Sequence, residues 1–492
     1  QKISIIMIKN QKKEKMKKNN IKILAVGCLL LILNSCGIPK IATQENKVAL
    51  PSNYADNLKT ENSSGKIKWK DFFEDPYLQK LIDSTLVNNK ELNILMQKVN
   101  MAQNEIQARK GEYLPSVGFG ASADLDKVGE FTRNGAVEKN LNIKEEEKFP
   151  EPLTNYKFGL YSSWELDVWK KLRNSKKAAV MEYMASQEGK NYFVTNLVAE
   201  VSNSYYELIA LDSQLKNLEQ NIEIQKNALK IVQLLKESAR TTQLAVKRFE
   251  AEVQKNQSEI YNLKQDILET ENKINFLVGR TPQTIERNSD NFINLQPKVV
   301  SMGLPADLLE NRPDIKQAQL EIEAAKLNIK VAKANFYPQF GLKAGLGYEA
   351  FNPKFLLNSP ESLLYSIAGD AIMPLVNRNA IKATYKTASA KQIQSVYEYE
   401  QTVLNAYTEV VNQLSKIENL ENSFKLKNQQ VTALNESIEI ANQLFLSARA
   451  DYMEVLLTQR DALEAKTALI ETRKNQMLTV INLYKALGGG WN

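Results

Sequence analysis

Histidine is absent from this chain, and only two cysteines, Cys28 and Cys36, occur among its 492 residues. Without histidine the usual general base of enzymes is missing, and a zinc site would depend on carboxylates alone. The sequence also lacks the G-x-x-x-x-G-K-[ST] loop that cradles nucleotide phosphates. Paired carboxylates in the polar stretch 145–147 are interpreted as a solvated charge run. The sequence therefore predicts a protein that is not an enzyme and that holds no cofactor and no metal.

Proline and glycine are scarce over two long parts of the chain. No proline lies between Pro152 and Pro282 or after Pro374, and no glycine lies between Gly369 and Gly488. In a helix interior proline costs about 3 kcal/mol and glycine about 1 kcal/mol relative to alanine. Long stretches that lack both residues therefore predict long helices and argue against a compact mixed fold.

The excess of positive charge is confined to the start of the chain. Residues 1–35 hold eight lysines and one glutamate, and the whole chain has a formal net charge of +7, so the remainder is balanced. A protein that binds nucleic acid carries its basic excess in the folded part. The charge distribution therefore argues against a nucleic-acid partner.

Residues 1–35 resemble a bacterial export signal whose translation starts at Met16. Lysines precede an apolar core, Ile21–Leu33, which is shorter than the roughly 20 apolar residues that a membrane-spanning helix needs. The core ends in the letters LNSC, which resemble a lipobox with Cys36 at the modified position. We predict that Cys36 carries lipid and that Cys28 is removed with the signal. The alternative for Cys36 is a small buried apolar residue.

The chain contains two copies of one plan. The letters SAR occur at Ser238–Arg240 and again at Ser447–Arg449, an offset of 209. Earlier in each copy, GEYLPSVGFG (Gly111–Gly120) resembles ANFYPQFGLK (Ala334–Lys343) at an offset of 223. The region between these anchors therefore differs in length by 14 residues. Further identities at the first offset join Asn203 to Asn412, Ile231 to Ile440, Val246 to Val455, and Gly279 to Gly488.

Two strands are expected in each copy, because apolar and polar residues alternate with a period of two. Each strand has about ten residues, which is the length that crosses a bilayer when tilted. Four strands cannot close a barrel, and an open edge cannot stand in lipid, so three chains would pool twelve strands. A soluble β-layer with one polar face is the alternative. For three of the strands the residues of one face are Val117, Phe119, Ala121 and Ala123; Phe158, Leu160, Ser162, Trp164 and Leu166; and Phe340, Leu342, Ala344, Leu346 and Tyr348. The fourth strand is expected near Tyr365–Leu375.

Each copy also predicts one long helix and shorter helices of about half its length. A helix rises 1.5 Å per residue, so the longest segments would span about 100 Å, and two half-length helices stacked end to end would match one. The apolar positions between Leu244 and Ile267 are interpreted as too irregular for the sustained heptads of a solid coiled-coil rod. A sleeve of helices is therefore expected. The helical segments are Val168–Ala239, Leu244–Leu277, Ala306–Asn335, Ala380–Ala448 and Tyr452–Leu487.

Several segments resemble the outer-membrane factor family, the TolC-like exit ducts of tripartite efflux pumps, and most closely its lipoprotein branch. The segment Leu304–Phe340, which contains LPADLLENRPDI, is similar to the most recognisable part of that family. The closing letters LYKALGGGW (Leu483–Trp491) are its usual ending. WKDFFEDPYLQKLI (Trp69–Ile82) resembles its N-terminal helix, and WELDVWKKLR (Trp164–Arg173) also fits.

The resemblance implies a mainly α-helical fold with a transmembrane β-barrel. Three identical chains would form a 12-stranded barrel continued by a long periplasmic α-helical tunnel. The implied function is a passive exit duct for substrates of a tripartite system, in the outer membrane, lipid-anchored, with the helices in the periplasm. The implied partners are two further copies of the chain, a periplasmic adaptor protein, an inner-membrane pump of the resistance-nodulation-division type and outer-membrane lipid. The transported compound is not implied.

By the same resemblance, the turns between long and half-length helices form a gate at the far end of the tunnel. Each residue of a trimer occurs three times around the axis, so a ring of like charge repels itself or binds a cation. The gate candidates are Arg240, Asn442, Arg449 and Asp451. Ordinary solvated charges at helix ends are the alternative. Arg312, Pro313 and Asp314 are expected to shape the start of a helix and not to touch substrate.

The expected organisation has four parts. Residues 1–35 form the signal, 36–68 a lipid-anchored segment, 69–300 the first structural repeat and 301–492 the second. The alternative to a duct is a lipid-anchored helical scaffold protein of the periplasm with no channel.

Overall fold

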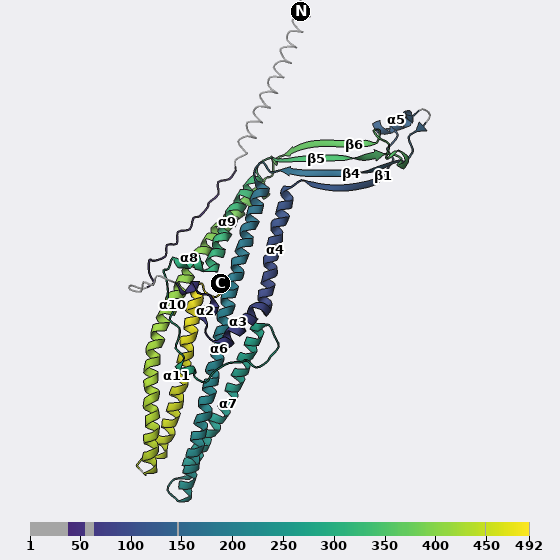
Figure 1. Ribbon diagram of the computed structural model, residues 1–492. Helices are drawn as coiled ribbons and strands as arrows, with labels where there is room; N and C mark the ends of the chain where they lie inside the picture. Colours follow the sequence, from purple (N-terminus) through teal and green to yellow (C-terminus); the bar gives the residue numbers. More distant parts are fainter. Residues whose placement is uncertain (1–37, 55–62, 145–146, 448, 492) are drawn as a thin grey trace, which may run out of the picture. The chain divides into compact units, whose positions relative to one another are not determined.

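We describe the protein from a computed structural model that covers residues 38–54, 63–144, 147–447 and 449–491. Cys36 and the expected signal lie outside these residues. The chain divides into two units, one made of 1–44, 104–180 and 323–394, the other of the remaining segments. In chain order (Figure 1), the elements are η1 (Ser64–Lys66), α2 (Trp69–Phe72), α3 (Pro76–Asn88), α4 (Lys90–Tyr113), β1 (Ser116–Asp126), α5 (Arg133–Asn140), β2 (Asn142–Lys144), β3 (Glu147–Lys148), β4 (Leu153–Leu166), α6 (Lys171–Glu237), α7 (Gln243–Val278), η2 (Phe292–Asn294), α8 (Asp307–Asn311), α9 (Pro313–Ala334), β5 (Gln339–Ala350), η3 (Pro353–Phe355), β6 (Leu363–Ile372), α10 (Asn379–Leu446) and α11 (Tyr452–Ala486).

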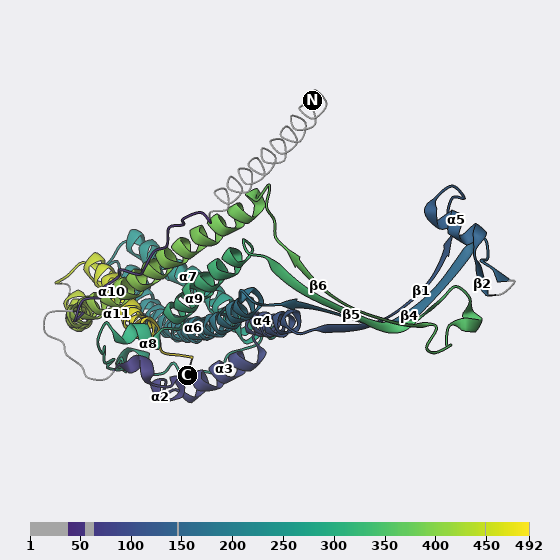
Figure 2. The same cartoon turned by 90° about the horizontal axis from the view of Figure 1, so that it is seen from above.

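The first unit contains a four-stranded antiparallel sheet in the order β1-β4-β5-β6, whose strands run side by side in Figure 2. Its register places Phe119, Leu160, Leu346 and Tyr365 in one row across the sheet. The prediction of four long strands per chain is confirmed. Strands β1 and β6 are the two edges, so among the residues that the structure describes each has one side without a partner strand.

The two faces of this sheet differ completely in charge. The register places every charged residue of the four strands on one face, and the opposite face has none. A sheet that faces lipid on one side and water on the other needs this division. The charged residues of the polar face are Asp124, Asp126, Lys157, Glu165, Lys343, Glu349 and Asp370.

The helix and strand ends recur at the offsets found in the sequence. Helix α6 ends at Glu237 and α10 at Leu446, whereas β1 begins at Ser116 and β5 at Gln339. The connection between β1 and β4 holds residues 127–152, and the connection between β5 and β6 holds residues 351–362. The first connection is therefore longer by 14 residues, which accounts for the difference between the two offsets. The internal duplication is thus visible in the fold.

The expected continuous helix Ala306–Asn335 is wrong, because the structure breaks it into α8 and α9 at Arg312. Arg312 is extended, with φ −87° and ψ 119°. Proline disfavours the helical conformation of the residue before it, so Pro313 ends α8 and starts α9. A second break divides the expected helix Trp69–Ile82, where Asp75 accepts hydrogen bonds from the first turn of α3 and caps it.

The interpretation that α7 lacks regular heptads is also wrong. The exposed residue Leu244 lies outside the pattern, and the seam begins at Val246. From there, buried and half-buried residues follow the alternating spacing of three and four that a coiled-coil seam requires. Polar residues occupy two of these positions, which hid the pattern in a count of apolar residues. The seam consists of Val246, Phe249, Val253, Asn256, Ile260, Leu263, Ile267, Thr270, Ile274 and Leu277.

Half-length helices meet end to end at two equivalent junctions in the second unit. At the first, Asn89 Nδ2 donates to the carbonyl of Leu277 across 2.8 Å, which joins the start of α4 to the end of α7. At the second, Arg312 Nη1 donates to the carbonyl of Ala486 across 3.0 Å, which joins the start of α9 to the end of α11. The two donors differ by 223 positions and the two acceptors by 209. The prediction that half-length helices stack is therefore confirmed at both places.

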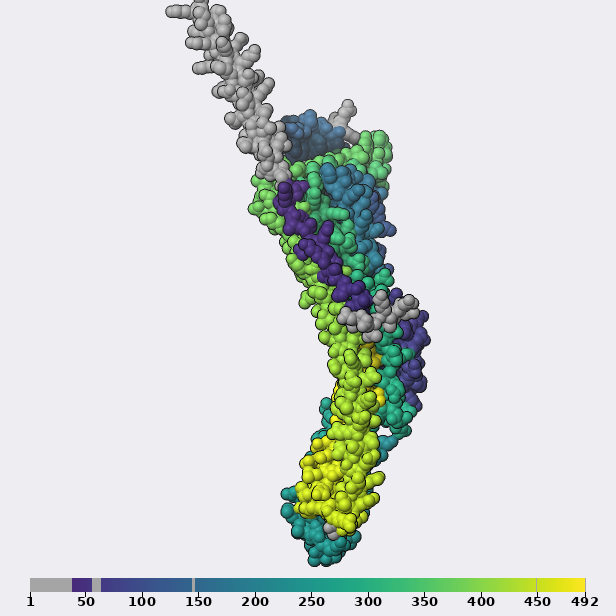
Figure 3. All heavy atoms as spheres, turned by 90° about the vertical axis from the view of Figure 1, so that its left-hand side faces the viewer, coloured from purple at the N-terminus to yellow at the C-terminus, as the bar shows by residue number. Residues whose placement is uncertain are grey.

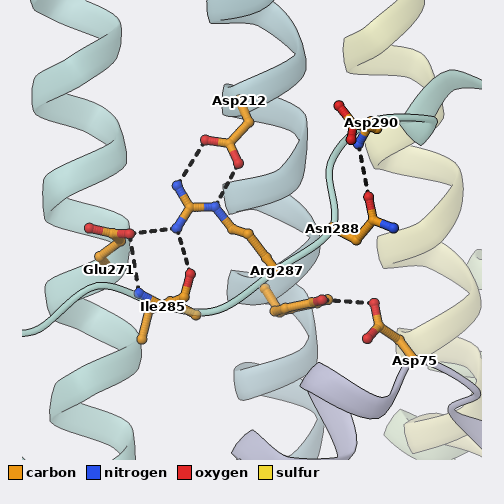
Figure 4. A network of polar contacts seen from close by, with 8 residues as sticks. Asp75, Asp212, Glu271, Ile285, Arg287, Asn288 and Asp290 are labelled. Atoms are coloured by element: carbon orange, nitrogen blue, oxygen red, sulfur yellow. Dashed lines mark hydrogen bonds and ion pairs between the residues drawn. The ribbon is translucent and has the colours of Figure 1, made fainter.

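The second unit has the larger apolar core, which gathers residues from α2, α3, α6, α7 and α11. Phe72 and Tyr484 stack there, with ring centroids 3.9 Å apart. At its edge, Arg287 binds Asp212 of α6 and Glu271 of α7 and fixes the segment that follows α7 (Figure 4). Burial alone would lower the pKa of Arg287, but the two carboxylates raise it. Among the described residues, no helix has the length and apolar character needed to cross a membrane.

Residues 38–54 form an extended strand of chain that lies along α10, as the dark segment in Figure 3 shows. In the first unit, Gln392 binds the backbone of Gln44 twice, through Oε1 to the N–H at 3.1 Å and through Nε2 to the carbonyl at 2.8 Å. In the second unit, Lys47 N–H donates to Glu400 across 2.9 Å. Side chains of one helix therefore hold the extended segment in place.

Candidate functional site

The first turn, residues 238–242, connects α6 to α7. Ala239 has φ 54°, the left-handed region that side chains other than glycine rarely adopt. Arg240 N–H donates to the carbonyl of Leu235 across 2.8 Å, which closes the end of α6. The Thr242 hydroxyl accepts from Ala245 N–H at 3.3 Å and caps α7. The turn is thus closed on both sides by hydrogen bonds, even though alanine occupies its left-handed position.

The second turn, Ser447 with residues 449–451, connects α10 to α11. Arg449 N–H donates to the carbonyl of Leu444 across 2.8 Å, which repeats the closure seen at Arg240. Asp451 stands at the N-cap of α11, but its side chain makes no capping hydrogen bond. The start of α11 is therefore held by one contact fewer than the start of α7.

A cluster of apolar side chains joins the two turns, and we call it the tip cluster. Phe249 is its largest fully buried member, at 1% exposure, and Val232 of α6 is equally buried. Arg248 Nη1 also lies 3.0 Å from Met453 Sδ, so a residue of α7 contacts a residue of α11. Side chains next to the two turns are therefore packed against one another. The members are Val232, Ala245, Val246, Phe249 and Leu456, with Ala228, Leu229, Phe445, Tyr452 and Met453 packed against them.

The structure places the gate candidates at these turns. Arg240, Arg449 and Asp451 are exposed, and Asn442 is half-buried in the last turns of α10. Within the part of the chain that the structure describes, none of the three charged residues forms an ion pair inside one chain. The tip cluster and Arg248 were missed by the sequence analysis. The heptad seam of α7, which begins at Val246, is the signal that could have identified Phe249 as a buried residue.

Arg312 lies away from these turns and is a structural residue. It is 4% exposed, and it binds Asp314 through two hydrogen bonds and Glu409 of α10 through a third. Burial alone would lower the pKa of Arg312, but Asp314 and Glu409 outweigh this effect and raise it. The prediction that Arg312 shapes the start of a helix is in keeping with these contacts.

The fold combines two features. One is a sheet of long antiparallel strands with its charged residues on one face, and the other is a long helix with stacked half-length helices, present in two copies. Together they are typical of outer-membrane efflux channels. The chain belongs to the outer membrane efflux protein family, whose model matches residues 81–280 and 304–489. Efflux through the outer membrane is therefore its function, and the predicted family is confirmed.

Two relatives illustrate the similarity. The cation efflux system protein CusC of Escherichia coli O6:H1 is 26% identical over 479 residues, which cover 94% of this chain and 98% of the relative. The pyoverdine export outer membrane protein OpmQ of Pseudomonas putida is 26% identical over 424 residues, which cover 86% of this chain and 88% of the relative. Their names state different cargoes at the same identity, so the identity does not select one cargo for this chain.

Solved structures show the same fold. A crystal structure of CusC has a TM-score of 0.78 at 24% sequence identity and covers 92% of this chain and 99% of its own. The outer-membrane channel OprN has a TM-score of 0.81 at 22% identity and covers 93% of this chain and 99% of its own. These likenesses confirm the predicted fold class, a mainly α-helical fold with a sheet of four strands per chain.

Proposed function

We propose that three copies of this chain form a passive exit duct of a tripartite efflux system. The charge-divided sheet is the observation that carries the proposal. Its apolar face suits lipid, but the backbone groups at the free sides of β1 and β6 cannot stand unpaired there. Pairing β1 of one copy with β6 of the next satisfies them and closes twelve strands around a polar lumen.

The remaining partners follow from the family and are part of the same proposal. The duct receives cargo from a periplasmic adaptor and an inner-membrane pump of the resistance-nodulation-division type, and its helices stand in the periplasm. It performs no catalysis of its own. We also propose the organisation with a signal over 1–35, an anchored segment over 36–68, and repeats over 69–300 and 301–492.

Single-channel recording in planar bilayers tests the duct, and native mass spectrometry in detergent tests its assembly. A trimer with discrete conductance steps is expected. A monomer that keeps its full β-content would contradict the shared barrel. A stable trimer without conductance would favour the alternative, a lipid-anchored helical scaffold.

We propose further that Cys36 is the lipid attachment point. Ile38, two residues later, packs against the cluster of Ala332, Phe336 and Tyr385, and β5 begins only three residues after Phe336. An extended chain spans at most about 3.6 Å per residue, so the lipid would lie within about 7 Å of Ile38. An anchor at that place suits the lipid-facing strands of the same unit.

Intact-mass measurement of the mature protein tests the anchor. The wild type is expected to carry a lipid-sized increment, which Cys36→Ser should lose. The trimer should still assemble, because three chains bury far more apolar surface than one anchor does. A wild-type mass without the increment would refute the lipidation.

We propose that the two turns form the gate, with the second turn moving more than the first. The missing cap at Asp451 supports this order, since α11 begins with fewer restraints than α7. Arg449 and Asp451 would bind across subunits in the closed state, while Arg240 and Asn442 line the same end. An exposed ion pair is worth about 0–1 kcal/mol. Three copies acting together would bias the closed state by about 2 kcal/mol, a population shift of about thirtyfold.

The double variant Arg449→Ala with Asp451→Ala tests the gate. It should raise single-channel conductance and sensitivity to large antibiotics without changing the yield of trimer. The matched control is Arg460→Ala with Asp461→Ala, because these residues form a surface ion pair of 3.2 Å within α11, away from the turn. If the gate variant and the control both behave as wild type, Arg449 and Asp451 are ordinary surface charges.

A further inference from the structure

A small polar cavity lies in the second unit between α6, the segment 289–294 and α11. Its volume is about 180 Å³. One water molecule occupies roughly 30 Å³ of liquid, so the cavity holds a small polyatomic group together with some water. Apart from its charged residues, the cavity is lined mostly by side chains that carry a hydroxyl or an amide. The cavity is therefore built to bind a polar group and not an apolar one.

Two lysines supply the charge of this cavity. Lys216 comes from α6 and Lys466 from α11, and both line it. Within the described part of the chain, Lys466 forms no ion pair. Lys216 reaches Asp290, which also lines the cavity, at 3.1 Å, but the Asp290 side chain is 86% exposed. Figure 4 shows Asp290 beside Asn288. Such an exposed pair is weak, and the lining keeps a net positive charge.

A buried arginine stands directly behind the wall of the cavity. Arg473 of α11 is 4% exposed, and its Nε donates to the carbonyl of Ile293, a lining residue, across 2.9 Å. Its other contacts are the amide oxygen of Gln476 and the ring face of Phe424. No carboxylate among the described residues pairs with it. A buried cation without an anion is costly, and an anion in the cavity would compensate this charge.

One lining side chain lacks a hydrogen-bond partner. Asn217 of α6 is 6% exposed, and its Nδ2 finds no acceptor among the described residues. An unpaired buried donor is costly. Water does not reach this Nδ2 in the structure, so an acceptor oxygen bound in the cavity would remove the cost once the Asn217 side chain turns toward it.

We propose that this cavity is a binding site for a phosphate group, either inorganic phosphate or a phosphate ester. Its oxygens accept hydrogen bonds from Lys216 and Lys466, and from Asn217 once that side chain turns toward the cavity. Its charge partly offsets that of Arg473, which lies outside the lining. The two lysines belong to helices of different repeats, so a bound phosphate would link α6 to α11. The site is independent of the gate and of the proposed transport.

Equilibrium dialysis of the full chain in detergent micelles, with radiolabelled inorganic phosphate at constant ionic strength, tests the site. One phosphate per chain should bind saturably. Hydrogen bonds to charged groups contribute about 1.5–3 kcal/mol, so Lys216→Gln and Lys466→Gln should each weaken binding by about tenfold or more. Lys466→Arg keeps the charge and should largely retain binding.

The controls separate the site from general charge effects and identify the source of the phosphate. Lys264→Gln, an exposed lysine of α7, should bind phosphate as the wild type does. Displacement by glycerol 3-phosphate below the concentration of phosphate itself would assign the site to an ester, and the reverse order to the free ion. Stronger displacement by acetate would overturn the assignment. So would wild-type chain that binds no phosphate in the millimolar range, or unchanged binding by the folded Lys466→Gln protein.

Discussion

At each of the two helix junctions a side chain donates a hydrogen bond to the backbone carbonyl at the end of the neighbouring helix, but the donor group differs. In the first repeat a neutral amide, Asn89, donates to the end of α7, whereas in the second a guanidinium, Arg312, donates to the end of α11. Behind each donor a glycine with positive φ, Gly279 or Gly488, lets the two backbones approach. The shared part is the backbone geometry, and the divergent part is the side chain.

The difference shows what the second junction does in addition. The side-chain oxygen of Asn89 accepts a hydrogen bond from Leu92 N–H, so Asn89 caps its own helix, α4. Arg312 instead reaches α10 through Glu409 and is held by Asp314. The second junction therefore joins three helices where the first joins two. A buried ion pair is strongly destabilised when one partner is removed, so the second junction should be the more sensitive one.

The largest effect is expected for Arg312→Ala. The change leaves Asp314, Glu409 and the Ala486 carbonyl without their donor, and it should lower the free energy of unfolding by about 3–5 kcal/mol. Urea unfolding of the detergent-solubilised protein, followed by circular dichroism, measures it. Arg460→Ala, which removes a half-buried arginine and its surface ion pair with Asp461, serves as the control. A loss below about 1 kcal/mol would mean that the ion pairs around Arg312 are not what holds this junction.

The paired variants Gly279→Ala and Gly488→Ala test the shared geometry. An added Cβ would lie 2.5 Å from the Asn88 carbonyl oxygen in the first and 2.6 Å from that of Asn311 in the second. Positive φ costs a further 1–2 kcal/mol or so. Both variants should therefore lose about 2 kcal/mol or more, by similar amounts.

The control for this pair is Gly111→Ala in α4, where an added Cβ meets no atom within 4 Å. That change should stabilise the protein slightly, by about 0.4–1 kcal/mol. Thermal unfolding of the three variants side by side provides the measurement. Clearly unequal losses at positions 279 and 488 would contradict the equivalence of the junctions.

A smaller loss is expected for Asn89→Ala. The variant leaves the Leu277 carbonyl and the Leu92 N–H unpaired, and such a change costs about 1–3 kcal/mol. This variant leaves no buried charge without a partner, so the loss of unfolding free energy should be smaller than that of Arg312→Ala. The same urea titration measures it, with exposed Asn262→Ala as the reference. A loss equal to that of Arg312→Ala would remove the distinction between a neutral and a charged junction.

The smallest effect concerns the first turn. Ala239→Gly relieves the left-handed strain and should stabilise the turn by about 0.5–1 kcal/mol, since glycine also costs unfolded-chain entropy. Hydrogen exchange of the Arg240 amide should slow accordingly. Ala251→Gly, at an exposed helical position of α7, should instead destabilise by about 1 kcal/mol. Faster exchange in Ala239→Gly would show that the alanine is not strained.

Much of the fold was predictable because its signals are local. The alternation in Val117–Ala123 and Phe340–Tyr348 predicted strands β1 and β5, and the lack of proline and glycine predicted α6 and α10. The two helix predictions were wrong where a single residue ended a helix that its neighbours favoured. Pro313, for example, keeps Arg312 out of the helical conformation. The seam of α7 was misread because Asn256 and Thr270 occupy positions where apolar residues were counted.

By itself, the sequence determined the family, the presence of four strands with the faces of three of them, the two long helices and the duplication. These properties depend on repeats of two or about 3.6 residues, or on letters that recur at a fixed offset, and each can be read within a short window. The tertiary structure alone decided that Phe249 meets Leu456 at the turns, and that Lys216 and Lys466 face one cavity. No local period links residues some 200 positions apart. Only the packing of separate helices brings them within contact distance.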